Sequence, residues 1–217
     1  TGDVRIEFYA AVKTAEPFLP AGTVIAREQT YVHTFYKKEA TAQQPATSKE
    51  EGNLVAFSGP DFKATFDKQS GLLTSYLYKK HEYILNGQGP RPFFWRAPTD
   101  NDYGANLPVR LKAWKEASYQ EPKAESFQVT PGSNATTVKV TYRFPQTEAR
   151  WNITYKIYAS GVIKVDNRFM AEGDQAPMIP RVGLRMQLPE SFTDLTYYGR
   201  GPKENYRDRR TSQFIGE

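Results

Sequence analysis

The segment from position 95 to 104 contains side chains that could take part in catalysis or ligand binding. This segment gathers an arginine, an amide and two carboxylates: Arg96, Asp100, Asn101 and Asp102. Three oxygen-bearing side chains in a row resemble the start of a calcium loop, but an EF-hand beginning at Asp100 would need a bidentate glutamate where Leu111 stands. An EF-hand is therefore excluded. A less regular cation site stays an alternative, and our prediction is that the chain binds no metal.

A second polar segment, 198–210, combines acidic side chains with a cluster of arginines. Its charged members include Glu204, Asp208, Arg200, Arg207, Arg209 and Arg210. Hydrolysis of a glycosidic bond needs two carboxylates roughly 5 to 10 Å apart, a distance that sequence does not give. Carboxylates in turn-like segments more often cap backbone amides or pair with arginine. We therefore predict a structural ion-pair network around Glu204 and Asp208.

Other catalytic patterns are missing from the sequence. There is no cysteine, which excludes thiol catalysis, cysteine-ligated zinc and disulfides. The two histidines, His33 and His81, are far apart in sequence and have no companions at ligand spacing, so we interpret both as structural. The glycine pairs that begin at Gly87 and Gly199 lack the third glycine and the following helix of a nucleotide-binding loop.

The elements that must position the two polar segments are predicted to be β-strands. Apolar residues alternate with polar ones over 62–66, 138–144, 153–157 and 182–188, a period that is typical of half-buried strands. Turn residues lie between these runs, as at Gly71 and Gly161. Strands joined by short turns form antiparallel sheets, and their number favours a β-sandwich.

One stretch departs from the strand pattern. Leu107, Leu111 and Trp114 follow helical spacing, which predicts one short amphipathic helix near 106–117, capped by Asn106. At the N-terminus, 4–12 and 23–36 are predicted to be two strands. The composition of 39–52, rich in Ala, Thr, Gln, Ser and Glu, predicts a linker. We therefore divide the chain into 1–38, the linker 39–52, and a larger domain over 53–217.

Composition limits the possible partners. Lysine and arginine number 29 against 24 acidic residues, a net charge of +5, with both signs interspersed. This pattern indicates a solvated, ion-paired surface and predicts no nucleic-acid partner. No apolar run reaches the roughly 18 residues that span a bilayer, so we expect a soluble protein without a membrane partner. The sequence begins at Thr1 and both ends look cut, which leaves cytoplasm and periplasm open as the compartment.

Both polar segments lie in motifs that resemble a known family. Residues 90–104 resemble the R-x-x-F-W-R-A-P-T-D-N-D-x-G signature of the β-galactosidase small-chain domain in glycoside hydrolase family 2. Residues 180–184 and 198–209 resemble its P-R-x-G and Y-G-R-G-P-x-E-N-Y-x-D-R runs. The resemblance covers about 53–217, whereas residues 1–36 are similar, more weakly, to the end of the immunoglobulin-like domain that precedes it.

The resemblance implies a fold and a context. The fold would be an all-β, antiparallel supersandwich of galactose-mutarotase type, truncated and preceded by the last strands of an immunoglobulin-like sandwich. The parent enzyme would hydrolyse terminal β-D-galactosides with retention, through two glutamates on a barrel that is absent here. The chain would then be an accessory part, inactive alone. A free-standing carbohydrate-binding or mutarotase-like module is the alternative, although mutarotase chemistry needs a histidine in a supporting motif.

The resemblance also implies a site and partners. It places Arg96, Asp100, Asn101 and Asp102 at the rim of the active site, where they would line or support the substrate entrance. No cofactor is expected in this chain, since the Mg and Na of such enzymes are bound mainly by other domains. The expected partners are the remaining domains of the parent β-galactosidase, a β-galactoside, and further copies in a homo-oligomer. The natural galactoside and the oligomeric state stay open.

Overall fold

The computed structural model describes residues 2–35, 44–173, 177–203 and 206–217. The chain forms two compact units, one over residues 42–192 and one in which residues 1–41 group with 193–217. The sequence instead places 53–217 in one domain, and that boundary stays a prediction.

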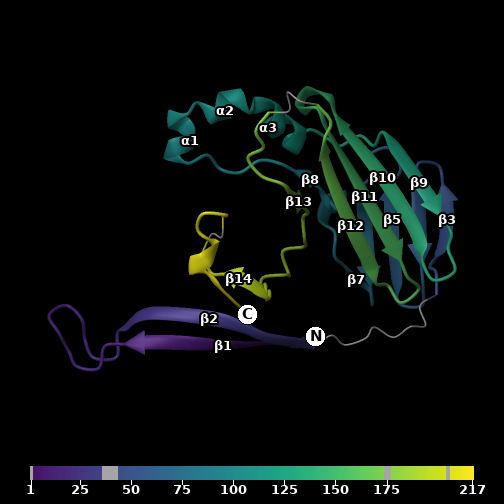
Figure 1. Cartoon of the computed structure of the whole chain (residues 1–217). Coiled ribbons are helices and arrows are strands. Elements are labelled where there is room, and N and C mark those ends of the chain that lie inside the picture. Colours follow the sequence, from purple (N-terminus) through teal and green to yellow (C-terminus); the bar gives the residue numbers. More distant parts are fainter. Residues whose placement is uncertain (1, 36–43, 174–176, 204–205) are drawn as a thin grey trace. The chain divides into compact units, whose positions relative to one another are not determined.

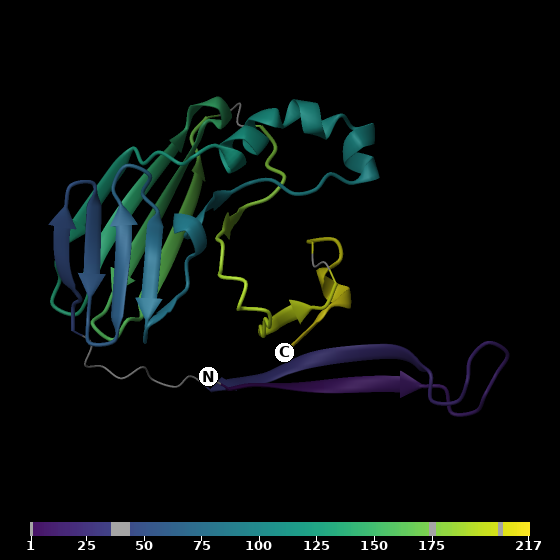
Figure 2. The same ribbon diagram turned by 180° about the vertical axis from the view of Figure 1, so that it is seen from behind.

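The larger unit is built on two antiparallel sheets that pack face to face (Figures 1 and 2). Each sheet runs through its strands in sequence order, as expected for hairpins joined by short turns. The five-stranded sheet consists of β3 (Thr47–Glu51), β4 (Leu54–Ser58), β5 (Phe62–Asp67), β6 (Leu73–Tyr78) and β7 (His81–Glu82). The four-stranded sheet consists of β9 (Ser126–Thr130), β10 (Thr136–Phe144), β11 (Ala149–Ile157) and β12 (Ile163–Ala171).

The core lies between these two sheets and is made of the residues that alternate in the sequence. Phe66 on β5 and Tyr155 on β11 meet across the interface with ring centroids 5.0 Å apart. Every second residue of β10 and β11 is buried from Thr136 to Tyr142 and from Ala149 to Ile157. The predicted strands 62–66, 138–144 and 153–157 are confirmed, and so is the all-β antiparallel class. The likeness to mutarotase stays a prediction.

The predicted strand over 182–188 is wrong for most of its length. Only β13 (Gly183–Arg185) forms, paired with the equally short β8 (Arg91–Phe93). An antiparallel strand needs a backbone partner along its length, and β8 supplies one for three residues only. The apolar side chains of the run also stay well exposed, at 38% for Leu184 and 46% for Met186.

The predicted linker over 39–52 also differs from the structure. Residues 39–43 lie outside the described ranges, whereas Thr47–Glu51 is the edge strand β3. All five side chains of β3 are exposed, so the strand depends on backbone hydrogen bonds to β4 and needs no apolar face. Composition therefore carried no sign of it.

Three helices replace the single predicted one: α1 (Asp100–Gly104), α2 (Leu107–Arg110) and α3 (Lys112–Tyr119). The predicted cap at Asn106 is wrong, since its side chain makes no capping bond and its φ is 54°. Its backbone N–H instead ends α1 by donating to Tyr103 O at 2.9 Å. Asparagine tolerates the left-handed backbone conformation that this position requires. The predicted apolar face is confirmed, because Leu111 and Trp114 are buried.

The smaller unit is a long hairpin with a short sheet attached. The hairpin pairs β1 (Gly2–Ala11) with β2 (Val24–Phe35), which confirms the two predicted N-terminal strands. The attached sheet pairs β14 (Gly199–Gly201) with β15 (Phe214–Gly216). The Gln29 amide joins the two parts by donating to Ile215 O at 2.8 Å and accepting from Ile215 N at 3.0 Å. The immunoglobulin-like origin of this unit stays a prediction.

Candidate functional site

The 95–104 loop leaves β8 beside a buried aromatic anchor. Phe94 is fully buried, and its ring packs 4.9 Å from that of Trp114 on α3 and 5.4 Å from that of Trp151 on β11. Its backbone N–H donates to Ser118 Oγ at 2.9 Å, and Ser118 Oγ donates to Trp114 O at 2.7 Å. The start of the loop is thus fixed to both α3 and the sandwich core.

The far end of the loop is fixed by a capping box. Thr99 precedes α1 and accepts a hydrogen bond from Asp102 N at 3.4 Å, while Asp102 Oδ2 accepts from Thr99 N at 2.8 Å. This reciprocal arrangement satisfies two backbone donors at the start of the helix. The sequence carried its signal, a threonine followed three residues later by an acidic residue, which sequence reasoning missed.

Arg96 and Asp102 close the loop with a bidentate ion pair. Arg96 Nη2 donates to Asp102 Oδ1 at 2.9 Å, and Nη1 donates to Oδ2. The Arg96 guanidinium, helped by the backbone N–H of Thr99, lowers the pKa of the Asp102 carboxyl to about 2. Asp102 therefore carries a charge at neutral pH that is already matched within the loop.

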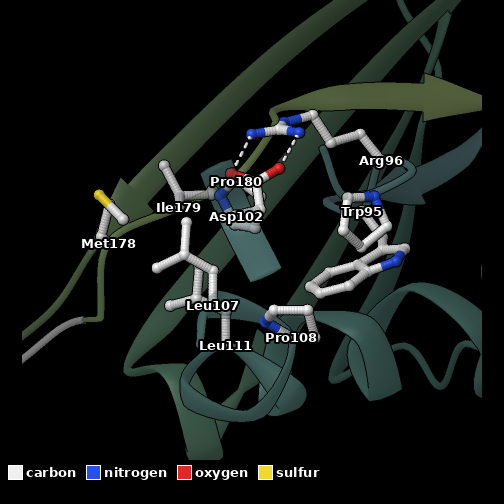
Figure 3. A pocket seen from close by; sticks show the side chains of 10 residues that line it. Trp95, Arg96, Asp102, Leu107, Pro108, Leu111, Met178, Ile179 and Pro180 are labelled. Carbon is white, nitrogen blue, oxygen red and sulfur yellow. Dashed lines mark hydrogen bonds and ion pairs between the residues drawn. The ribbon is translucent and has the colours of Figure 1, made fainter. Parts of the chain in front are cut away.

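A small apolar pocket lies against this ion pair (Figure 3). Its volume is about 120 Å³. Trp95 lies on one side, Met178 and Ile179 on the other, and Leu107 and Leu111 below, with the Arg96–Asp102 pair above (Figure 3). The full lining is Trp95, Arg96, Pro98, Asp102, Leu107, Pro108, Leu111, Met178, Ile179 and Pro180. A mostly apolar wall with one charged pair suits the flat face of a small organic group.

The four predicted site residues separate into two pairs. Arg96 and Asp102 meet in the ion pair and line the pocket. Asp100 and Asn101 lie on the exposed side of α1 and do not line it. Their assignment to a substrate entrance stays a prediction for all four. Sequence reasoning did not name Trp95 or Leu107 as site residues. It also missed the irregular segment 178–180, because nothing local predicts that this segment returns to the loop.

In the described part of 198–210, hydrogen bonds connect the segment to Arg210 and Gln213. Arg200 Nη1 donates to Gln213 O at 2.7 Å and to Arg210 O at 3.0 Å, and the buried Gln213 accepts from Lys203 N at 3.1 Å. Glu204 lies outside the described residues, so the predicted ion-pair network with Asp208 stays a prediction. Asp208 itself is exposed.

Metal-ligand clusters and membrane-spanning helices are both absent from the described part of the chain. Among these residues no group of three or more histidine, aspartate or glutamate side chains is placed to hold a metal ion. No helix in the described ranges is long and apolar enough to cross a bilayer.

Comparison with known proteins gives the family. The sequence profile described as "Beta galactosidase small chain" matches residues 58–217, which include the pocket and both polar segments. The chain belongs to the β-galactosidase small-chain family. The match begins within β4, so it covers nearly the whole larger unit and the 193–217 part of the smaller one.

Several curated relatives are named β-galactosidase. The β-galactosidase of Priestia megaterium (strain DSM 319 / IMG 1521) is 34% identical over 171 residues, which are 78% of this chain and 16% of the relative. That of Clostridium acetobutylicum is 35% identical over 163 residues, 75% of this chain and 18% of the relative. That of Streptococcus thermophilus is 30% identical over 214 residues, 97% of this chain and 20% of the relative. The chain thus spans a fifth or less of these proteins.

Proposed function

We propose that this chain is an accessory region of a retaining β-galactosidase of glycoside hydrolase family 2. In this proposal the 95–104 loop shapes the rim of an active site whose two catalytic glutamates belong to another domain. Arg96 and Asp102 are positioning residues, whereas the exposed Asp100 and Asn101 face the incoming β-galactoside. The chain alone is inactive. The magnesium and sodium ions of the full enzyme are held mainly by other domains, and the full enzyme is a homo-oligomer.

The observation that carries the proposal is the double attachment of the loop. Phe94 fixes one end to α3 and the core, and the Thr99–Asp102 capping box fixes the other. A rim that positions a substrate must hold its geometry closely, because small misplacements are costly in rate. The low pKa of Asp102 supports the same role, since a carboxylate matched by Arg96 is a poor proton donor at neutral pH.

The proposal is tested in the full enzyme that carries this chain. Replacing Arg96 by glutamine leaves Asp102 without its partner and loosens the loop. We expect kcat/KM for a nitrophenyl β-galactoside to fall about tenfold or more, mostly through a higher KM. Arg110→Gln is the matched control, because Arg110 is exposed on α2 and does not line the pocket.

Two results separate this proposal from its alternative. If Arg96→Gln and Arg110→Gln have equal kinetics, the loop does not shape the site. Titration of the isolated chain with galactose tests a carbohydrate-binding module. Saturable binding at millimolar sugar would favour that module, and the absence of binding would favour an accessory role.

A further inference from the structure

Two arginines face each other across the short β8–β13 pair. In the register of this antiparallel pair, Arg91 is directly opposite Arg185. Like charges at directly opposed positions destabilise a sheet. The pair is therefore an unfavourable element of the fold unless a negative group lies beside it.

Arg91 receives little compensation from acidic side chains. It is 92% buried, and the carboxylate nearest to it is that of Glu121 at 4.0 Å, whose side chain is 78% exposed. The guanidinium donates to neutral acceptors instead, namely Gln88 Oε1 at 3.2 Å and the carbonyls of Ser118 and Gln120 at the end of α3. Its Nε is buried without any hydrogen-bond partner in the described structure. Burial is the largest influence and lowers the pKa of Arg91; the Glu121 carboxylate raises this pKa, and the charge of Arg185 lowers it further.

Arg185 is held in place without an acidic partner. Its guanidinium lies 5.4 Å from the ring centroid of Phe93 and 5.9 Å from that of Tyr119. Across the described ranges no carboxylate forms an ion pair with it. Two aromatic faces thus fix an exposed cation, which reduces the entropy that a ligand must remove on binding.

A pocket of about 90 Å³ opens between these two arginines and the end of α3. Its wall also includes Gln88, Ser118, Tyr119, Met186 and Gln187. One water needs roughly 10–15 Å³ of such space, so the pocket has room for a group with several oxygen atoms. None of these residues lines the pocket beside the 95–104 loop.

We propose that this pocket binds a small tetrahedral oxyanion such as phosphate or sulfate. Two guanidinium groups supply the charge, and the amide side chains can supply further donors in other directions. The anion lies beside the β8–β13 pair, between the side chains of Arg91 and Arg185, and offsets their repulsion. It therefore holds β13 against β8, a pairing that is otherwise only three residues long. This proposal does not rest on the accessory role, since it concerns a different pocket.

The test is calorimetric titration of the chain with inorganic phosphate at constant ionic strength. We expect one saturable site in the unmodified chain. In Arg185→Gln the affinity falls about tenfold or more, because a charge-assisted hydrogen bond is lost. Arg185→Lys keeps the charge but loses the forked geometry. Its affinity for phosphate is expected to lie between that of the unmodified chain and that of Arg185→Gln. Arg168→Gln is the matched control, since Arg168 is an exposed arginine on β12 of the same unit.

Thermal unfolding checks the same site independently of heat of binding. Phosphate raises the unfolding temperature of the unmodified chain and of Arg168→Gln, whereas Arg185→Gln gains nothing beyond the effect of matched sodium chloride. Absence of saturable binding, or binding that survives unchanged in Arg185→Gln, would overturn the proposal. Acetate binding as tightly as phosphate would overturn the choice of a tetrahedral anion and indicate a carboxylate as the occupant.

Discussion

At the scale of single residues, Asp102 shows how one side chain joins local and tertiary structure. Its oxygens accept from Thr99 N, which starts α1, and from Arg96, which lies before that helix in the loop. Both donors favour the ionised carboxylate, and the pKa falls to about 2. The geometry of the 95–104 loop therefore depends on the charge of the Asp102 carboxylate.

This linkage predicts a pH dependence of stability. The folded-state pKa of Asp102 lies below its ordinary value of 3.8, so the ionised group stabilises the fold above about pH 4 and this contribution is lost as the pH falls toward 2. Asp102→Asn is thus expected to lower the urea midpoint at pH 7 but to change it little near pH 2. A midpoint difference that is the same at both pH values would contradict the ion pair.

At the scale of secondary-structure elements, the sequence predicts what depends on periodicity. Apolar and polar residues alternate in β5, β10 and β11, and this alternation indicates strands with one buried face. These strands were therefore predicted. The exposed strand β3 and the short β8 depend on backbone partners elsewhere in the chain, and no side-chain pattern reports those. The break between α2 and α3 at Leu111 was missed for a related reason, because the apolar spacing of 107–114 continues through it.

The candidate site divides in the same way. Arg96 and Asp102 were predicted as site residues because they lie in one short motif, and the structure joins them in an ion pair; their role at a site stays a prediction. Met178 and Ile179 were not found, because they reach the pocket from about eighty positions away in sequence. A contact of that separation is set by tertiary packing, not by local sequence.

A turn glycine gives a test at this scale. Gly71 connects β5 to β6 at a φ of 74°, and a methyl group there would lie 2.5 Å from Val140 Cγ1 and 2.6 Å from the Tyr142 hydroxyl. Gly71→Ala combines left-handed backbone strain with overpacking of the core, so we expect a loss of about 2–5 kcal/mol in the free energy of unfolding.

Gly52 provides the matched control. It connects β3 to β4 at a φ of 57°, and a methyl group there meets no atom within 4 Å. Gly52→Ala should therefore cost only the backbone term, about 1–2 kcal/mol. Urea unfolding of both variants measures the difference. Equal losses would mean that the Gly71 turn does not pack on β10 as described.

At the scale of the whole molecule, the chain matches one part of much longer proteins. It spans 16 to 20% of the three β-galactosidases compared above, while the family profile matches most of its own length. Its smaller unit also joins segments that are distant in sequence, since residues 193–217 group with 1–41. Sequence reasoning did not find this grouping, because it depends on contacts such as that between Gln29 and Ile215.

We propose that this chain supports β-galactoside hydrolysis without performing it. The direct measurement is the release of nitrophenol from a nitrophenyl β-galactoside by the isolated chain and by the full enzyme that contains it, at equal molar concentration. We predict turnover by the full enzyme and none above the buffer rate by the chain. Turnover by the isolated chain that is lost in Asp102→Asn would contradict the claim, because it would place the chemistry in this chain itself.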